Sequence, residues 1–176
     1  MDLSKISKGG QIFAAGGIVY FIASLLPWYT LDVGPELRSF GIADISANAW
    51  GDIGFLWGSL WAILLIAGAV ALILPAFGVG APKLPAAAYL AVAALATLFT
   101  VLKLIIGEDD PISTGFGLYL AVIAALVALF GAFTMFKDAG GSLSDLKDMN
   151  KMKSQFASGG GTPPPPPSMP PPPPPR

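Results

Sequence analysis

Four long apolar segments dominate this sequence and limit what it can fold into. Each is close to the ~20 residues that an α-helix needs to cross roughly 30 Å of hydrocarbon, and three of them contain no charged residue. A backbone in lipid has no water to bond with, so such segments have to be helical. The sequence therefore predicts an all-α integral membrane protein. Residues 9–136 form a four-helix transmembrane bundle, with spans at about 9–29, 53–79, 85–106 and 112–136.

The composition agrees with a membrane protein and excludes several classes of function. Hydrophobic residues make up 54% of the chain and charged residues only 12%. Cysteine and histidine are both absent, which excludes disulfides, Cys/His zinc sites and catalytic triads that use histidine. A net charge of -1 gives no general attraction to nucleic acid. We therefore predict no enzyme, no cofactor and no nucleic-acid partner, with the lipid bilayer as the main surroundings.

The basic residues of the short loops predict the orientation, because loops rich in lysine and arginine stay in the cytoplasm. Loops on one side of the membrane carry most of the lysines, whereas those on the other side are mainly acidic. We expect a plasma-membrane protein with residues 1–8 and the C-terminus in the cytoplasm, and an outer loop at 30–52. The lysines of the inner side are Lys5, Lys8, Lys83, Lys137, Lys147, Lys151 and Lys153; the acidic residues of the outer side are Asp32, Glu36, Asp44, Asp52, Glu108, Asp109 and Asp110.

The C-terminal part differs in composition from the spans. Apolar residues recur at helical spacing within 137–157, which predicts a short amphipathic segment beside the membrane. Residues 158–176 hold a glycine spacer and two proline runs, which predict a disordered or polyproline II tail. Polyproline II docks into aromatic grooves of soluble proteins at little entropic cost. We predict a cytoplasmic partner for the tail, with a plain spacer as the open alternative; the residues that mark the two runs are Pro163, Pro167, Pro170 and Pro175.

Small residues at the start of the second span predict close helix packing. Gly54, Gly58 and Ala62 are spaced four apart, and small residues at that spacing let two helix backbones approach in lipid. Packing inside one bundle is the first interpretation, and a homo-oligomer is the second.

Tryptophan and tyrosine mark the outer boundary of the spans. Trp28 and Tyr29 close the first span, and Trp50, Trp57 and Trp61 lie near the start of the second. Such residues favour the headgroup region, so we predict an aromatic belt there.

Lys103 is the one ionisable residue inside a predicted span. A charge in the membrane is costly and marks a candidate functional residue. Its long side chain can extend outward to the carboxylates of Glu108–Asp110 or Asp52, and an ion or proton path is the alternative. Three consecutive acidic residues do not easily converge on one cation, so we expect Glu108–Asp110 to form a solvated turn and predict no metal site.

Three stretches together resemble a known family. They are the run Phe21–Leu31 (FIASLLPWYTL), the run Ile112–Leu120 (ISTGFGLYL) and the proline-rich tail. The chain resembles a family of actinobacterial four-span membrane proteins, some of them called antigenic proteins, over roughly residues 10–136. The resemblance implies a role in the cell envelope and supplies no catalytic residues.

We therefore predict a membrane anchor or adaptor of the cell envelope that presents a cytoplasmic proline-rich arm. The alternative is a small transporter or channel subunit, although a conduction path normally needs polar lining. The scarcity of polar residues inside the spans favours the adaptor.

Overall fold

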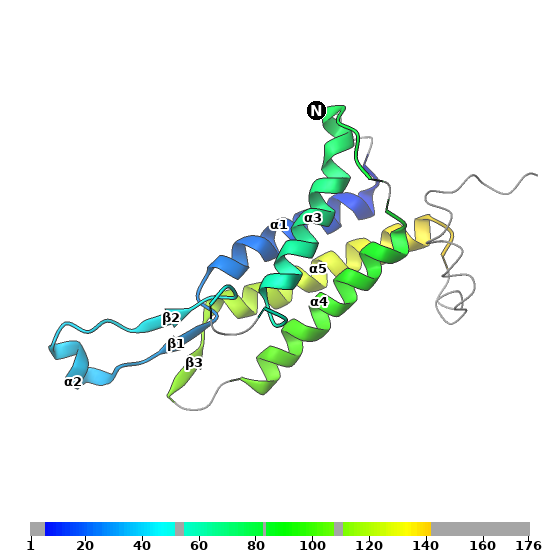
Figure 1. Cartoon of the computed structure of the whole chain (residues 1–176). Helices are drawn as coiled ribbons and strands as arrows, with labels where there is room; N and C mark the ends of the chain where they lie inside the picture. The colour runs from blue at the N-terminus through cyan, green and yellow to red at the C-terminus, as the bar shows by residue number, and fades with distance from the viewer. Residues whose placement is uncertain (1–5, 52–54, 83, 108–110, 142–176) are drawn as a thin grey trace, which may run out of the picture.

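The computed structural model describes residues 6–51, 55–82, 84–107 and 111–141, and most of these are helical (Figure 1). The long helices are α1 (Lys8–Leu25), α3 (Ser59–Ile73), α4 (Ala86–Ile106) and α5 (Phe116–Asp138), and a 3-10 turn η2 (Leu74–Phe77) extends α3. Three helical stretches are long and apolar enough to cross a membrane, namely Ser59–Phe77, α4 and α5. The prediction of helices that are long and apolar enough to span a membrane is confirmed for these three.

Helix α1 begins with polar residues and ends earlier than predicted. The Ser7 hydroxyl caps its N-terminus by accepting a hydrogen bond from the Gly10 amide at 3.1 Å. The helix stops at Leu25 because a residue before proline is driven out of the helical region, and Leu26 is extended ahead of Pro27. With 18 residues and Lys8 in its first turn, α1 is not among the three stretches that qualify by length and hydropathy.

α1 and α5 run antiparallel with their backbones in close contact. A Cβ on Gly9 would lie 2.8 Å from the carbonyl oxygen of Gly131, and a Cβ on Gly16 would lie 2.6 Å from the backbone nitrogen of Ala128. A Cβ on Gly131 would in turn meet the backbone of Phe13. Small residues therefore bring the two helices together along most of their length, as they do in membrane helix pairs generally.

A small antiparallel sheet continues from the end of the bundle where α1 stops and α5 starts. Strand β1 (Tyr29–Leu31) lies between β2 (Ile45–Ala47) and β3 (Ile112–Thr114). The all-α prediction missed this sheet, and the fourth span was predicted to begin at Ile112, where the structure has a strand. Of the two pairings, β1 with β2 closes a hairpin, whereas β1 and β3 are separated in sequence by α3 and α4, so only tertiary structure brings β3 beside β1.

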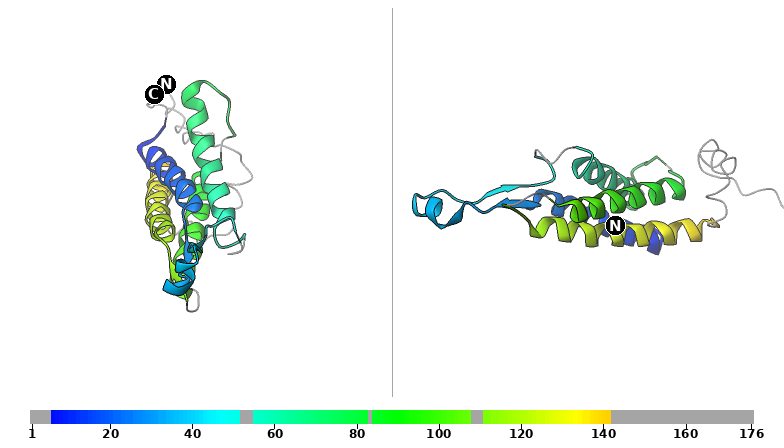
Figure 2. Two further views of the ribbon diagram at one scale, coloured as in Figure 1. Left: turned by 90° about the vertical axis from the view of Figure 1, so that its left-hand side faces the viewer. Right: turned by 90° about the horizontal axis from the view of Figure 1, so that it is seen from below.

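The predicted outer loop at 30–52 is folded around the β1–β2 hairpin, which extends away from the helices (Figures 1 and 2). A short helix, α2 (Gly34–Ser39), forms its tip. The Arg38 guanidinium bonds there with Asp32 at 3.0 Å and with Asp44 at 2.9 Å. The hydrogen bond from Arg38, together with one from the Val33 amide, holds the pKa of the Asp44 carboxyl below its usual value.

Most of the aromatic residues predicted to form a belt at the membrane boundary are buried in the core instead. Trp28 is fully buried, and its indole nitrogen donates to the carbonyl oxygen of Ala23 at 3.0 Å. Tyr29 and Trp61 are also buried, whereas Trp50 is exposed over 40% of its surface. Because the chain turns sharply after α1, the Trp28 side chain points into the bundle, and the expected belt is mostly buried. The largest fully buried apolar and aromatic side chains are Phe13, Tyr20, Trp28, Leu65 and Leu118.

The connection from α3 to α4 is open rather than the tight turn that its prolines and glycines predict. Gly78 ends η2 in the left-handed region with φ 77°, which glycine adopts without strain. Pro85, just before α4, has an extended backbone. Toward this end of the bundle α3 diverges from the other long helices (Figure 1), and it contacts α4 more sparsely than α4 contacts α5.

Several predictions concern parts of the chain outside the described residues. These parts include Gly54 and Asp52, the acidic turn Glu108–Asp110, the amphipathic segment beyond Gly141, and the whole proline-rich tail. The tail residues Pro163, Pro167, Pro170 and Pro175 belong to this group, and their predicted role stays a prediction.

Candidate functional site

Lys103 is buried where the bundle meets the sheet. It lies in the last turn of α4 and has only 7% of its surface exposed. Its ammonium group lies over two aromatic rings, 5.2 Å from the ring centre of Tyr29 and 5.6 Å from that of Trp57. Both distances are within the range of cation–π attraction, which strengthens as the cation loses water.

Three segments of the chain form an aromatic box, defined here as Tyr29, Trp57, Trp61 and Phe99; the first two face the ammonium, and the other two pack with Trp57. Tyr29 comes from β1, and its hydroxyl donates to the backbone carbonyl of Lys103 at 3.3 Å. Trp57 lies in the turn before α3, 5.8 Å from Phe99 between ring centres, and Trp61 lies 5.1 Å from the same ring. The carbonyl of Lys103 also accepts a hydrogen bond from the Gly107 amide at 3.0 Å. Tyr29 therefore contacts both the backbone and the ammonium group of Lys103.

The box connects β1, the start of α3 and the end of α4 through one cation. Sequence analysis identified Lys103 but not its aromatic surroundings. The carboxylates that it was predicted to reach, Asp52 and Glu108–Asp110, lie outside the described residues, so that ion pair stays a prediction. The described residues can hold a protonated amine against the faces of aromatic rings.

A short chain of hydrogen bonds crosses from α1 to α4 inside the core. The Tyr20 hydroxyl lies 2.8 Å from the Thr100 hydroxyl, which donates to the Ala96 carbonyl at 2.7 Å. Since the Thr100 proton is used in that bond, the Tyr20 hydroxyl is the donor to Thr100. A tyrosine in the middle of a predicted span needs such a partner, and that sequence signal could have identified the pair.

Of the two glycines predicted to pack near α3, the structure describes Gly58. Gly58 is the residue before α3, with a non-helical backbone (φ -142°, ψ -59°), and the helix begins at Ser59. A Cβ on Gly58 would lie 2.6 Å from the Cβ of Ala49, and Ala62 is fully buried. Gly54 lies outside the described residues, so the prediction that Gly54, Gly58 and Ala62 share one packing face stays a prediction.

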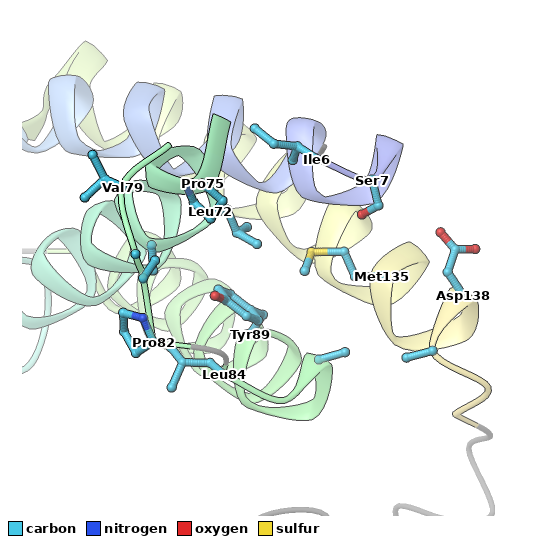
Figure 3. A pocket seen from close by; sticks show the side chains of 15 residues that line it. Ile6, Ser7, Leu72, Pro75, Val79, Pro82, Leu84, Tyr89, Met135 and Asp138 are labelled. Carbon is cyan, nitrogen blue, oxygen red and sulfur yellow. The ribbon is translucent and has the colours of Figure 1, made fainter. Parts of the chain in front are cut away.

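A cavity of about 720 Å³ opens at the end of the bundle opposite the sheet (Figure 3). We call it the basal cavity. It lies between the α3–α4 connection, the start of α1 and the end of α5. Its walls are mainly apolar; those labelled in Figure 3 include Leu72, Pro75, Leu84, Tyr89 and Met135, with Ser7 and Asp138 as polar residues at the helix ends.

A narrower cleft of about 250 Å³ continues from the basal cavity along α3 and α4. The two spaces share Ala71, Pro82, Leu84 and Tyr89. The deeper walls of the cleft are apolar and include Phe13, whose ring meets that of Tyr89 edge-on with centres 5.2 Å apart. Sequence analysis did not predict either space, because both depend on how far α3 and α4 separate.

No family model, curated protein or solved structure matches this chain. Among the residues that the structure describes, no three acidic, cysteine or histidine side chains gather where they could hold a metal ion. The resemblance to actinobacterial four-span proteins stays a prediction.

Proposed function

We propose that this chain is a non-enzymatic membrane anchor of the cell envelope. It spans the membrane four times, holds a folded hairpin outside and extends a proline-rich arm into the cytoplasm for a protein partner. The observation that carries this proposal is the continuous hydrogen bonding between the helix ends and the sheet. The Trp28 amide donates to Ala47 at 2.8 Å, and the amides of Gly115 and Gly117 donate to Trp28 at 2.7 Å and to Pro27 at 2.9 Å.

These bonds support a rigid junction between the membrane part and the hairpin. Pro27 and Trp28 lie between α1 and β1, and Gly115 and Gly117 lie at the junction of β3 and α5. A hairpin that is bonded to two helices at its base cannot swing freely relative to them. An anchor that displays a surface in a fixed orientation needs this property, whereas a flexible tether does not.

The contact between α1 and α5 supports α1 as the fourth span. Gly9 of α1 lies against Met135 near one end of α5, and Pro27 lies against Gly117 at the other end. α1 and the residues just after it therefore extend along nearly the whole length of α5, which qualifies as a span by itself. Because the two are antiparallel neighbours, a bilayer that contains α5 also contains α1.

The distribution of charge supports the anchor over a transporter or channel subunit. Lys8, Lys137 and Asp138 lie in terminal turns of α1 and α5, and Lys103 lies in the last turn of α4. No charged side chain lies midway along α1, α3, α4 or α5. Ions and protons that cross a membrane generally need polar or ionisable groups along their path.

The orientation follows from the lysine distribution, since basic loops remain on the cytoplasmic side. The test uses accessible tags, one between Glu36 and Ala47 and another after Arg176. We expect a membrane-impermeant reagent to label only the first tag in intact cells. Labelling of the second tag alone would overturn the orientation.

The role of the arm is tested by affinity purification from native membranes. We would compare the full chain with one that ends at Ser158, and with a control in which residues 163–175 become a Gly/Ser run of equal length. We expect both variants to lose a partner that the full chain recovers, while thermal unfolding shows an unchanged bundle. If the Gly/Ser variant recovers the same partners as the full chain, the arm is a spacer and the adaptor function is wrong.

A further inference from the structure

The basal cavity and its cleft form a continuous apolar space alongside two membrane spans. The cleft runs between α3 and α4, and both helices are long and apolar enough to cross a bilayer when η2 is included. In a bilayer the outer surfaces of α3 and α4 face hydrocarbon, so the cleft between them is open to lipid chains, while the mouth of the basal cavity lies at the helix ends. A volume of about 720 Å³ for the larger part is within the roughly 300–1,000 Å³ of small-molecule sites.

One polar group that is open to this space forms no hydrogen bond with any residue that the structure describes. Tyr89 has only 5% of its surface exposed, and its hydroxyl points toward the walls formed by Leu72 and Pro82 (Figure 3). Among the described residues nothing forms a hydrogen bond with this hydroxyl. A phenolic hydroxyl in apolar surroundings normally finds an acceptor, so the cavity calls for a ligand with an acceptor oxygen at this position.

The mouth of the cavity has opposite electrostatic character at its two sides. α4 begins there at Ala86 without a side-chain cap, and the N-terminus of a helix carries partial positive charge. α5 ends there with Asp138, whose carboxylate adds to the partial negative charge of a helix C-terminus. A headgroup with a phosphate and an ammonium matches this pair of charges.

We propose that the basal cavity binds one membrane phospholipid with an ammonium headgroup, such as a phosphatidylethanolamine. One acyl chain fills the cleft between α3 and α4, and an ester carbonyl accepts the hydrogen bond of Tyr89. The phosphate lies at the start of α4 and the ammonium at Asp138. Tyr89 is one turn into α4 from the membrane boundary, which is the depth where ester carbonyls meet hydrocarbon. This proposal does not depend on the adaptor role of the tail.

The experiment is native mass spectrometry of the full chain, released from nanodiscs that contain equal amounts of phosphatidylethanolamine and phosphatidylglycerol. Ala71→Leu places a larger side chain in the part shared by the cavity and the cleft, and Ala94→Leu is its matched control on the exposed surface of α4. Tyr89→Phe removes only the hydroxyl, and Tyr119→Phe is its control, since Tyr119 is 49% exposed on α5. Thermal unfolding checks that each variant is folded.

We expect the wild type and both controls to retain a single phospholipid, mainly phosphatidylethanolamine. Ala71→Leu should lose it, and Tyr89→Phe should bind it about fivefold more weakly, as loss of one neutral hydrogen bond implies. Equal retention by Ala71→Leu and Ala94→Leu would mean that the lipid is merely part of the surrounding bilayer. Retention of only detergent or free fatty acid, equal retention of both phospholipids, or identical binding by the two Tyr→Phe variants would each overturn the proposal.

Discussion

Replacing Gly16 with alanine tests the close contact between α1 and α5. In the structure a Cβ at this position would lie 2.6 Å from the backbone nitrogen of Ala128 and 2.9 Å from the carbonyl oxygen of Ala124. The shorter approach is about 0.8 Å less than the 3.4 Å at which ordinary contact begins. Backbone atoms of a helix cannot turn aside as a side chain does, so the two helices have to separate by a similar amount.

The expected change in the free energy of unfolding is the net of two opposing effects. Overpacking of this kind costs about 1–3 kcal/mol, and a gap of 0.5–1 Å between packed surfaces gives up a quarter to a half of their dispersion attraction. Alanine in place of glycine stabilises a helix interior by about 0.5–1 kcal/mol. We therefore expect Gly16→Ala to lower the free energy of unfolding by about 0.5–2 kcal/mol as the net of these terms.

Gly10→Ala is the matched control on the same helix. The nearest atoms to a Cβ there belong to side chains, with the Cγ2 of Ile6 at 2.9 Å and the hydroxyl of Ser7 at 3.3 Å. Such atoms can move, so the helix-forming gain of alanine should outweigh the strain, and the variant should be as stable as the wild type or more so. The assay is reversible unfolding in mixed detergent, followed by tryptophan fluorescence, to which the buried Trp28 and Trp61 contribute. If Gly16→Ala is no less stable than Gly10→Ala, the close backbone packing is not what holds α1 on α5.

Three further predictions concern polar groups. Lys103→Gln removes the cation from the aromatic box and should lower stability in the same unfolding assay by about 1–2 kcal/mol, the scale of desolvated cation–π contacts; an unchanged midpoint would contradict that role. Tyr20→Phe should cost about 1 kcal/mol by removing one buried hydrogen bond, and a similar loss in Thr100→Val with no further loss in the double variant would identify the pair as one unit. The pKa of Asp44 is lowered chiefly by the Arg38 hydrogen bond. This implies a contribution to hairpin stability that is present above the unfolded pKa of about 3.9 and lost as the pH falls through the lower folded value. In Arg38→Ala, a carboxyl titration followed by NMR should show the pKa of Asp44 rising toward its ordinary value, and no rise would refute the assignment.

Part of this structure could be read directly from residues that are neighbours in sequence. The hydrophobic runs of α3, α4 and α5 are local, and the requirement that a backbone in lipid satisfies its own hydrogen bonds makes them helical whatever surrounds them. The end of α1 is local for the same reason, because Pro27 restricts the residue before it. Lys103 was also identifiable as a candidate, since a charge in an apolar run can be recognised without knowledge of its neighbours.

The packing of small residues is only weakly marked in the sequence. Gly9 and Gly16 are seven residues apart, and a repeat at that spacing places them on nearly the same side of a helix. The nearer repeat of Gly54 and Gly58 is a stronger pattern, but Gly58 lies just before α3 rather than within it. Spacing alone cannot tell whether a segment is helical at both of its small residues, and Gly58 is not.

Only the tertiary structure decided the sheet, the aromatic box and the basal cavity. Strands of three residues are too short to show a period, and β1 pairs with β3 across more than half of the described chain. Trp28 is core and Trp50 is exposed because of how the chain turns between α1 and the hairpin, although the two residues are chemically identical. A cavity depends on the angle at which α3 leaves α4, and that angle results from the summed contacts of all the helices rather than from any local preference.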